Sequence, residues 1–156
     1  MLGHMATEIR PVPRVPGFVA ASKGVARRLL RLGPLMGPNA LLTVRGRKSG
    51  VPRTTPVALV AIGGRRWVVG TFGDVNWVRN LRSAGKATIA VGKRSEEVAA
   101  RELSLEEGTA FFRDVLGPYA RGLRIGPLLL RVLGAGDILE DPAGSARKRP
   151  VFELSR

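Results

Sequence analysis

The sequence predicts an α+β, mainly β, fold: a small antiparallel barrel with flanking helices. Five or six short segments have the composition of strands, and each is bounded by glycine, proline or polar residues. These segments follow one another too closely for helical crossovers, which argues against a parallel doubly wound sheet. The chain has 156 residues, of which 44% are hydrophobic and 5% aromatic, so it is long enough for one domain with an aliphatic core.

Residues 1–16 are expected to lie outside that domain, which is predicted to span residues 17–156. The first residues resemble a cloning scar, and the three prolines of residues 6–16 indicate an extended lead-in. Residues 17–32 have the periodicity of an amphipathic helix with a basic face, which Gly33-Pro34 ends. Such a helix packs on a core, forms a lid or makes peripheral contact with an anionic membrane.

The strands and one short helix are expected in the middle of the chain. Glycines mark two of the turns, at residues 46–50 and 63–64. The short helix is expected across residues 77–84, with Asp74 or Asn76 as its N-cap and Gly85 at its end. The expected strands span residues 40–45, 53–62, 66–71, 86–91, 96–102 and 150–154.

The later part of the chain is expected to be helical. Ser104-Leu105-Glu106-Glu107 has the pattern of a capping box and predicts a helix that runs to about residue 116. We expect Gly117-Pro118 to end that helix and Gly126-Pro127 to break the next segment. Residues 141–144 are expected to form a loop.

The residue types that the chain lacks restrict its chemistry. The sequence has no cysteine, and its single histidine, His4, lies in the suspected scar. Thiolate chemistry is therefore excluded, serine–histidine catalysis is not expected, and no metal site is expected. The side chains of such a chain are poorly suited to covalent or general acid–base catalysis, and a cofactor that carries the chemistry fits this composition well. No apolar run is long enough to span a bilayer and no secretory signal pattern is present, so a cytoplasmic location is expected.

The net charge of +14 is unevenly distributed along the chain. Residues 1–95 contain 17 Lys and Arg against two acidic residues, whereas residues 96–156 contain nine against ten. This excess predicts a polyanionic partner: a phosphate- and carboxylate-rich cofactor, an anionic membrane surface or nucleic acid. Nucleic acid is not expected, because the chain lacks interleaved surface aromatics for base stacking.

The strongest candidate site is Gly46-Arg47-Lys48-Ser49-Gly50-Val51-Pro52-Arg53, between two expected strands. Its two glycines free backbone N–H groups to bind an anion. Its three cations and the Ser49 hydroxyl suit phosphate oxygens. The spacing differs from that of a Walker loop, and a solvated hairpin tip has a similar composition.

A second candidate region is the glycine-containing segment that begins at Gly70. Such a segment after a strand lets the backbone approach a flat ring closely. Trp77 and Leu81 have helical spacing, and we expect them to anchor the core rather than stack on a ring. Asn80 binds either a ligand or a neighbouring backbone group.

Together these regions resemble the deazaflavin (F420)-dependent nitroreductase and quinone reductase family of split β-barrel proteins. The resemblance rests on Gly-Arg-Lys-Ser-Gly-x-Pro-Arg-x-x-Pro at residues 46–56 and Trp-x-x-Asn-Leu at residues 77–81, and it covers about residues 38–105. Pro-Val-Phe-Glu-Leu at residues 150–154 also resembles the family's last strand. The resemblance implies a split β-barrel that binds coenzyme F420. FMN is the alternative, because it is also a phosphorylated tricyclic ring and only the family resemblance favours the deazaflavin. By this resemblance, the phosphate and tail of the coenzyme are held by Arg47, Lys48, Ser49 and Arg53, and its ring lies near Gly70, Thr71, Trp77 and Asn80.

The resemblance also implies hydride transfer from reduced F420 to a quinone-like or other small, hydrophobic, electron-poor acceptor. The alternative is a non-catalytic carrier of a cofactor or lipid with the same fold. Because no histidine is available, the proton for the product comes from solvent, Tyr119 or Ser49. The family often has a lysine where this chain has Phe72-Gly73-Asp74, and Tyr119 is the only tyrosine, so nitroimidazole-type activity is not expected.

Overall fold

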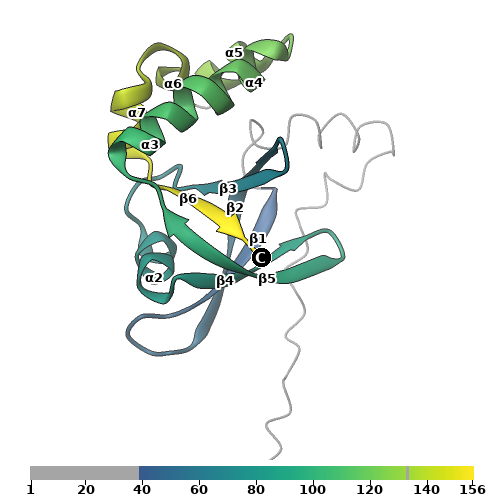
Figure 1. Cartoon of the computed structure of the whole chain (residues 1–156), viewed down its shortest axis with the longest axis vertical. Coiled ribbons are helices and arrows are strands. Elements are labelled where there is room, and N and C mark those ends of the chain that lie inside the picture. Colours follow the sequence, from purple (N-terminus) through teal and green to yellow (C-terminus); the bar gives the residue numbers. More distant parts are fainter. Residues whose placement is uncertain (1–38, 133) are drawn as a thin grey trace, which may run out of the picture. The chain divides into compact units, whose positions relative to one another are not determined.

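The computed structural model describes residues 39–132 and 134–156, which form a closed barrel of six antiparallel strands with helices beside it (Figure 1). The strands are β1 (Ala40–Arg45), β2 (Pro52–Ile62), β3 (Arg65–Val69), β4 (Lys86–Val91), β5 (Arg94–Glu102) and β6 (Val151–Ser155). They close the barrel in the order β1-β2-β3-β6-β5-β4. This architecture confirms the predicted fold class.

The strand boundaries agree closely with the local signals in the sequence. β1 and β4 have the expected bounds, and the other four strands are displaced by only one or two residues. Gly63 and Gly64 join β2 to β3 with φ angles of 62° and 76°. Two consecutive residues with positive φ match the twist of a tight hairpin, which is why glycine occupies both positions.

The first apolar cluster fills the barrel. Leu42 of β1 and Phe152 of β6 are buried in it, and both are at most 1% exposed. Helix α2 (Asn76–Ala84) adds Val78 and Leu81, which are fully buried against the same strands. Gly85 ends α2 with a φ of 68°, as expected. α2 is therefore part of the barrel core, which fixes its position beside the candidate site.

The N-terminus of α2 differs from the prediction. The N-cap residue is Val75, and no side chain caps the helix. Asp74 lies one residue before the N-cap, and its carboxylate is bound by Arg79 and Arg82. Asn76 is already the first residue of the helix.

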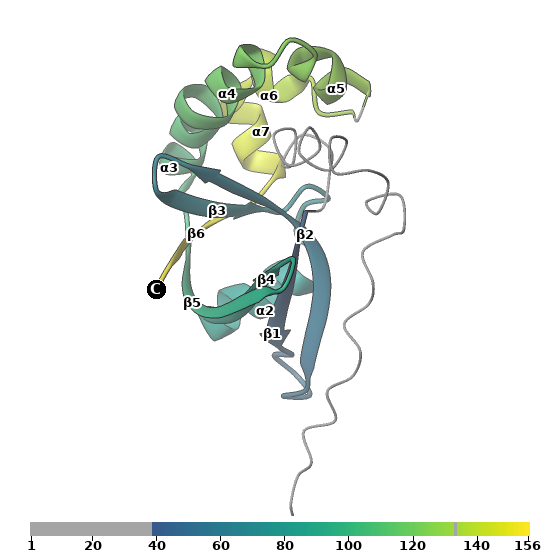
Figure 2. The ribbon, with the colours of Figure 1, turned by 90° about the vertical axis from the view of Figure 1, so that its right-hand side faces the viewer.

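The second apolar cluster joins the outside of the barrel to the helices that follow β5. Trp67 of β3 packs against Phe111 with 5.1 Å between ring centroids, and Phe112 is fully buried beside them. Figure 2 shows these helices gathered on one side of the barrel, next to β3 and β6. The helical layer is thus attached through β2, β3 and β6.

The first helical segment continues further than the sequence predicts. The capping box at Ser104 and Glu107 is confirmed and starts α3 (Leu105–Ala110), which continues as the π-helix η3 (Phe111–Leu116) and then α4 (Gly117–Gly122). The expectation that Gly117-Pro118 ends the helix is wrong. Pro118 lies in the first turn of α4, where a missing N–H is tolerated, and the N–H of Gly117 donates to the Phe112 carbonyl.

The last three helices complete this layer. The expected break at Gly126-Pro127 is confirmed, because α4 ends at Gly122 and a separate helix, α5 (Gly126–Val132), begins at Gly126. Helix α6 (Asp137–Glu140) follows. The expected loop at residues 141–144 is wrong, because α7 (Pro142–Lys148) begins there. The Asp141 carboxylate accepts the Gly144 N–H at 3.0 Å, and proline at the first helical position is favourable.

Two predictions lie outside the described residues. These are the lead-in of residues 6–16 and the helix of residues 17–32, so both remain predictions. Among residues 39–132 and 134–156, no helix is long and apolar enough to cross a bilayer.

Candidate functional site

The turn between β1 and β2 is held by its own backbone. The N–H of Gly46 donates to the Val51 carbonyl and the N–H of Gly50 donates to the Gly46 carbonyl, both at 2.9 Å. The Ser49 hydroxyl oxygen accepts the Val51 N–H at 3.2 Å. A Cβ atom on Gly46 would lie 2.9 Å from that oxygen, so glycine is required for Ser49 to fold over the turn. Arg47 and Lys48 are left exposed at its tip.

Asn80 connects this turn to α2. Asn80 is 4% exposed, and its Oδ1 accepts hydrogen bonds from the backbone N–H of Arg47 at 3.2 Å and from the Arg47 Nη1 at 2.7 Å. The two motifs identified in the sequence therefore meet, although Arg47 and Asn80 are 33 residues apart in the chain. Because its oxygen is already bound twice, Asn80 positions Arg47.

The turn keeps its positive charge. We define the cationic turn as Arg45, Arg47, Lys48 and Arg53, all of which are exposed. Within the described part of the chain, none of them forms an ion pair with a carboxylate. These four cations are therefore not neutralised by described residues and are available to an anionic ligand.

Lys86 is a further cation at this end of the barrel, and sequence reasoning missed it. β4 begins at Lys86 and pairs antiparallel with β1, with Thr43 opposite Thr88. That register places the start of β4 beside the end of β1, where the cationic turn begins. The position of Lys86 near the cationic turn follows from the pairing of β1 with β4, which local sequence patterns do not reveal.

The arginines on α2 have different surroundings. The Asp74 carboxylate accepts hydrogen bonds from Arg79 at 3.1 Å and from Arg82 at 3.0 Å, and Arg82 also donates to Glu102 at 2.8 Å. The hydrogen bonds from Arg82 and Arg79 hold the pKa of Asp74 below its usual value. The charges of these two arginines are therefore compensated locally.

The loop between β3 and α2, residues 70–75, which we call the glycine loop, is a tight turn that exposes an aromatic ring. The N–H of Gly73 donates to the Gly70 carbonyl at 3.0 Å, and Gly73 has a φ of 85°. Thr71 and Phe72 form the tip, and Phe72 is 86% exposed. Sequence reasoning noted Phe72 only where the family often has lysine. Its exposure depends on the geometry of the turn.

Gly70 has a structural role in this loop. It is buried, and its N–H donates to the Pro150 carbonyl at 2.7 Å. A Cβ atom there would lie 3.1 Å from both Pro150 Cδ and Val78 Cγ2, so the close contact between the loop and the start of β6 requires glycine. This contact fixes the position of the turn relative to the start of β6.

Trp77 and Leu81 pack as core anchors, as expected. Leu81 is fully buried, and the partly buried Trp77 packs on the barrel core with its ring centroid 6.5 Å from that of Phe152. Trp77 follows the glycine loop closely in sequence, so its exposed part remains a candidate contact for a ring.

The two candidate proton donors lie in different layers. Ser49 is exposed in the barrel turn, whereas the partly buried Tyr119 packs with the helical cluster. Burial raises the pKa of the Tyr119 phenol, which makes it a weaker proton donor near neutral pH.

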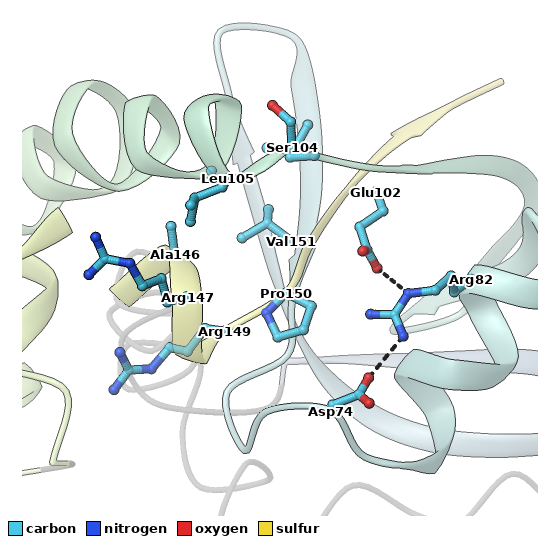
Figure 3. Close-up of a pocket in the computed structure, with 12 residues that line it drawn as sticks. Asp74, Arg82, Glu102, Ser104, Leu105, Ala146, Arg147, Arg149, Pro150 and Val151 are labelled. Carbon is cyan, nitrogen blue, oxygen red and sulfur yellow. Dashed lines mark hydrogen bonds and ion pairs between the residues drawn. The ribbon is translucent and has the colours of Figure 1, made fainter. Parts of the chain in front are cut away.

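A separate hollow of about 410 Å³ lies between Arg82 and helices α3 and α7 (Figure 3). One wall is the ion-paired group of Asp74, Arg82 and Glu102, and the facing wall includes Leu105 and Ala146. None of the residues predicted to bind a cofactor lines this hollow. The candidate cofactor-binding residues therefore lie outside this hollow, in the cationic turn, the glycine loop and α2.

A family model described as F420H(2)-dependent quinone reductase matches residues 19–121, which is more than half of the chain. The matched range contains the cationic turn, the glycine loop and α2. This chain belongs to the F420H(2)-dependent quinone reductase family.

Solved structures with a similar fold include three proteins of low sequence identity. An F420-H2 dependent reductase, FDR-A, is 21% identical, with a TM-score of 0.48 and coverage of 74% of this chain and 92% of that chain. HutZ, the heme storage protein from Vibrio cholerae, is 12% identical, with a TM-score of 0.45 and coverage of 82% and 87%. A Clostridium acetobutylicum protein related to general stress protein 26 of B. subtilis is 12% identical, with a TM-score of 0.45 and coverage of 74% and 72%.

Proposed function

We propose that this protein binds reduced coenzyme F420 and reduces a quinone-like acceptor by hydride transfer. The observation that carries the proposal is the cationic turn, which Asn80 fixes against α2 and which no described carboxylate neutralises. F420 has a phosphate and an oligoglutamate tail, which are the anions that such a turn suits. Membership of the F420H(2)-dependent quinone reductase family supports this choice of coenzyme.

The donor set suits a coenzyme with several negative charges. Arg47 donates to Asn80 through its backbone N–H and Nη1, which leaves its other guanidinium hydrogens for an anion. Lys48, Arg53 and the Ser49 hydroxyl are exposed beside it. The single phosphate of FMN needs fewer cations than this surface offers, so the charge favours F420 over the FMN alternative.

The glycine loop and α2 are proposed to hold the ring end of the coenzyme. Thr71 is exposed at the tip of the loop, Gly70 fixes the loop against Pro150, and Trp77 packs on the barrel core in the first turn of α2. When bound, reduced F420 supplies the hydride. The polypeptide then acts by holding the two reactants in a productive arrangement.

We further propose that Phe72 contacts the acceptor. An aromatic ring that is 86% exposed on a hydrogen-bonded turn has no packing role among the described residues. Phe72→Ala should raise the KM for a quinone about fivefold, because aromatic contacts contribute about 1 kcal/mol. Steady-state kinetics with a soluble quinone measures this. The melting temperature and the F420 dissociation constant should stay unchanged.

Val91→Ala serves as the matched control for Phe72→Ala. Val91 is another exposed apolar side chain, 41% exposed, at the end of β4. An unchanged KM in Phe72→Ala, or the same rise in both variants, would show that Phe72 does not contact the acceptor.

The test of the function itself is an equilibrium titration with F420 and FMN side by side, followed by turnover. Ring fluorescence gives both dissociation constants, and absorbance follows oxidation of reduced F420 by a panel of quinones. We expect tighter binding of F420 than of FMN, and oxidation that requires the protein. Binding without turnover would support the carrier alternative. Tighter binding of FMN, or no binding of F420, would overturn the choice of coenzyme.

A further inference from the structure

The connection between α4 and α5 carries an exposed surface that the proposed function does not use. Ile125 and Leu128 are 47% and 62% exposed. Arg121, Arg124 and Arg131 are exposed in the same segment. We call these five residues the α4–α5 surface; its helices can be followed in Figure 2. Large apolar side chains at such exposure, interleaved with cations, are typical of an interaction surface.

The positive charge of this surface is only weakly compensated. Residues 115–136 contain three arginines and no acidic residue. Arg131 lies 3.8 Å from Glu140, with both side chains more than 70% exposed, and Arg121 donates to the Leu139 carbonyl. Because an exposed ion pair at that distance contributes little, the surface remains cationic.

We propose that the α4–α5 surface docks on an anionic lipid bilayer. Ile125 and Leu128 enter the boundary between headgroups and acyl chains, and the arginines bind lipid phosphates. An anionic bilayer supplies an apolar interior for Ile125 and Leu128 and negatively charged phosphates for the arginines. The docking goes beyond the proposed function, because it locates the protein where lipid-soluble acceptors are found.

Charge argues against a second copy of this chain as the occupant of the surface. Two copies that meet at this surface would bring three arginines opposite three arginines. Four of the five residues lie beyond residues 19–121, the range that the family model matches.

Vesicle binding by the full chain tests the docking. We expect strong co-sedimentation with vesicles of equimolar phosphatidylcholine and phosphatidylglycerol, and weak co-sedimentation with phosphatidylcholine alone. Ile125→Ser/Leu128→Ser should lower the partition coefficient about tenfold, whereas Val91→Ser should change it less than about twofold. Equal partition by these variants and the unsubstituted protein would overturn the proposal.

A charge-matched pair separates local docking from the attraction of the whole cationic protein. Arg124→Gln/Arg131→Gln and Lys93→Gln/Arg94→Gln each remove two exposed cations. Only the first pair should lower the partition coefficient by about fivefold or more. The same loss in both pairs would mean that net charge alone drives binding, and would overturn the proposal.

Quenching of an introduced tryptophan provides a test that does not depend on a loss of vesicle binding. Leu128→Trp should be quenched by vesicles with brominated acyl chains beyond the quenching of the unsubstituted protein, and Val91→Trp should not. Absence of this quenching would overturn insertion at Leu128. Self-association without lipid that Ile125→Ser/Leu128→Ser abolishes would identify a second copy as the occupant. No F420 is present in these experiments, so their outcome is independent of the proposed function.

Discussion

Helix α2 lies between two groups of cations that differ in whether carboxylates are bound to them. Beside Asn80, the cationic turn has no carboxylate partner within the described residues. On another side of the helix, Arg79 and Arg82 are bound to Asp74, and Arg82 is also bound to Glu102. The first group is available to a ligand, whereas the second fixes the glycine loop to the helix.

This difference shows that net charge alone does not locate a binding site. The chain has 26 Lys and Arg against 12 acidic residues, and many of the described arginines are engaged in ion pairs. What distinguishes the cationic turn is the lack of compensation together with a fixed backbone. Paired cations should therefore affect stability, and unpaired cations should affect ligand affinity.

The largest effect is expected at the most buried ion pair among the described residues. Arg149 is 8% exposed and binds Asp137 at 2.6 and 3.0 Å, and the Ser145 hydroxyl donates to the same carboxylate at 2.8 Å. Asp137→Asn should lower the free energy of unfolding by roughly 3 kcal/mol, because it leaves a buried guanidinium without a counter-charge. Urea denaturation measures this. The F420 affinity of the folded variant should be unchanged. A loss of F420 affinity in this variant would contradict the assignment of stability to paired cations and of ligand affinity to unpaired cations.

The pH dependence of this pair sharpens the same prediction. Hydrogen bonds from Arg149 and Ser145 lower the pKa of Asp137 to about 2. Because the folded-state pKa lies below the unfolded value, the stabilisation is complete above about pH 4 and is lost as the pH falls toward 2. The difference in unfolding free energy between the unsubstituted protein and Asp137→Asn should therefore shrink over that range. A constant difference would show that the charge of Asp137 is not the cause.

An intermediate effect is expected where charge is added beside the cationic turn. Asn80→Asp keeps an acceptor for the Arg47 N–H and Nη1, so the turn should stay in place. The new carboxylate pairs with Arg47 and should weaken F420 binding about fivefold. Fluorescence titration measures the affinity. Unchanged affinity would mean that the charge of Arg47 does not contribute to binding.

The smallest effect is expected on the paired side of α2. Arg79→Ala removes an exposed cation but leaves Asp74 bound to Arg82. We expect a change of less than about 0.5 kcal/mol in the free energy of unfolding and less than about twofold in F420 affinity. Denaturation and titration together check both numbers. A loss of affinity comparable to that of Asn80→Asp would place the anionic ligand on the wrong side of the helix.

Local signals in the sequence predicted most of the barrel. The hairpin glycines, the stop at Gly85 and the capping box at Ser104 act within a few residues, and the structure confirms them. The errors at Gly117-Pro118 and residues 141–144 have a different origin. There the turn-forming residues occupy the first turns of helices that pack on the second apolar cluster, so tertiary packing overrides the local pattern.

The candidate site was only partly predictable for the same reason. The cationic turn is a continuous motif and was found directly. The contact of Asn80 with Arg47 and the position of Lys86 depend on pairings between distant segments. The exposure of Phe72 depends on the turn that Gly73 closes. A single sequence does not show these contacts.

The most direct measurement compares the F420 dissociation constants of two charge-matched variants. Lys48→Ala/Arg53→Ala removes two cations at the cationic turn. Lys93→Ala/Arg94→Ala removes two exposed cations at the turn between β4 and β5, which the register of β1 with β4 places at the other end of β1. We expect the F420 dissociation constant to rise by about tenfold or more in the first variant and to change by less than about twofold in the second. Equal losses in the two variants would show that the coenzyme responds to the net charge of the protein and not to the cationic turn.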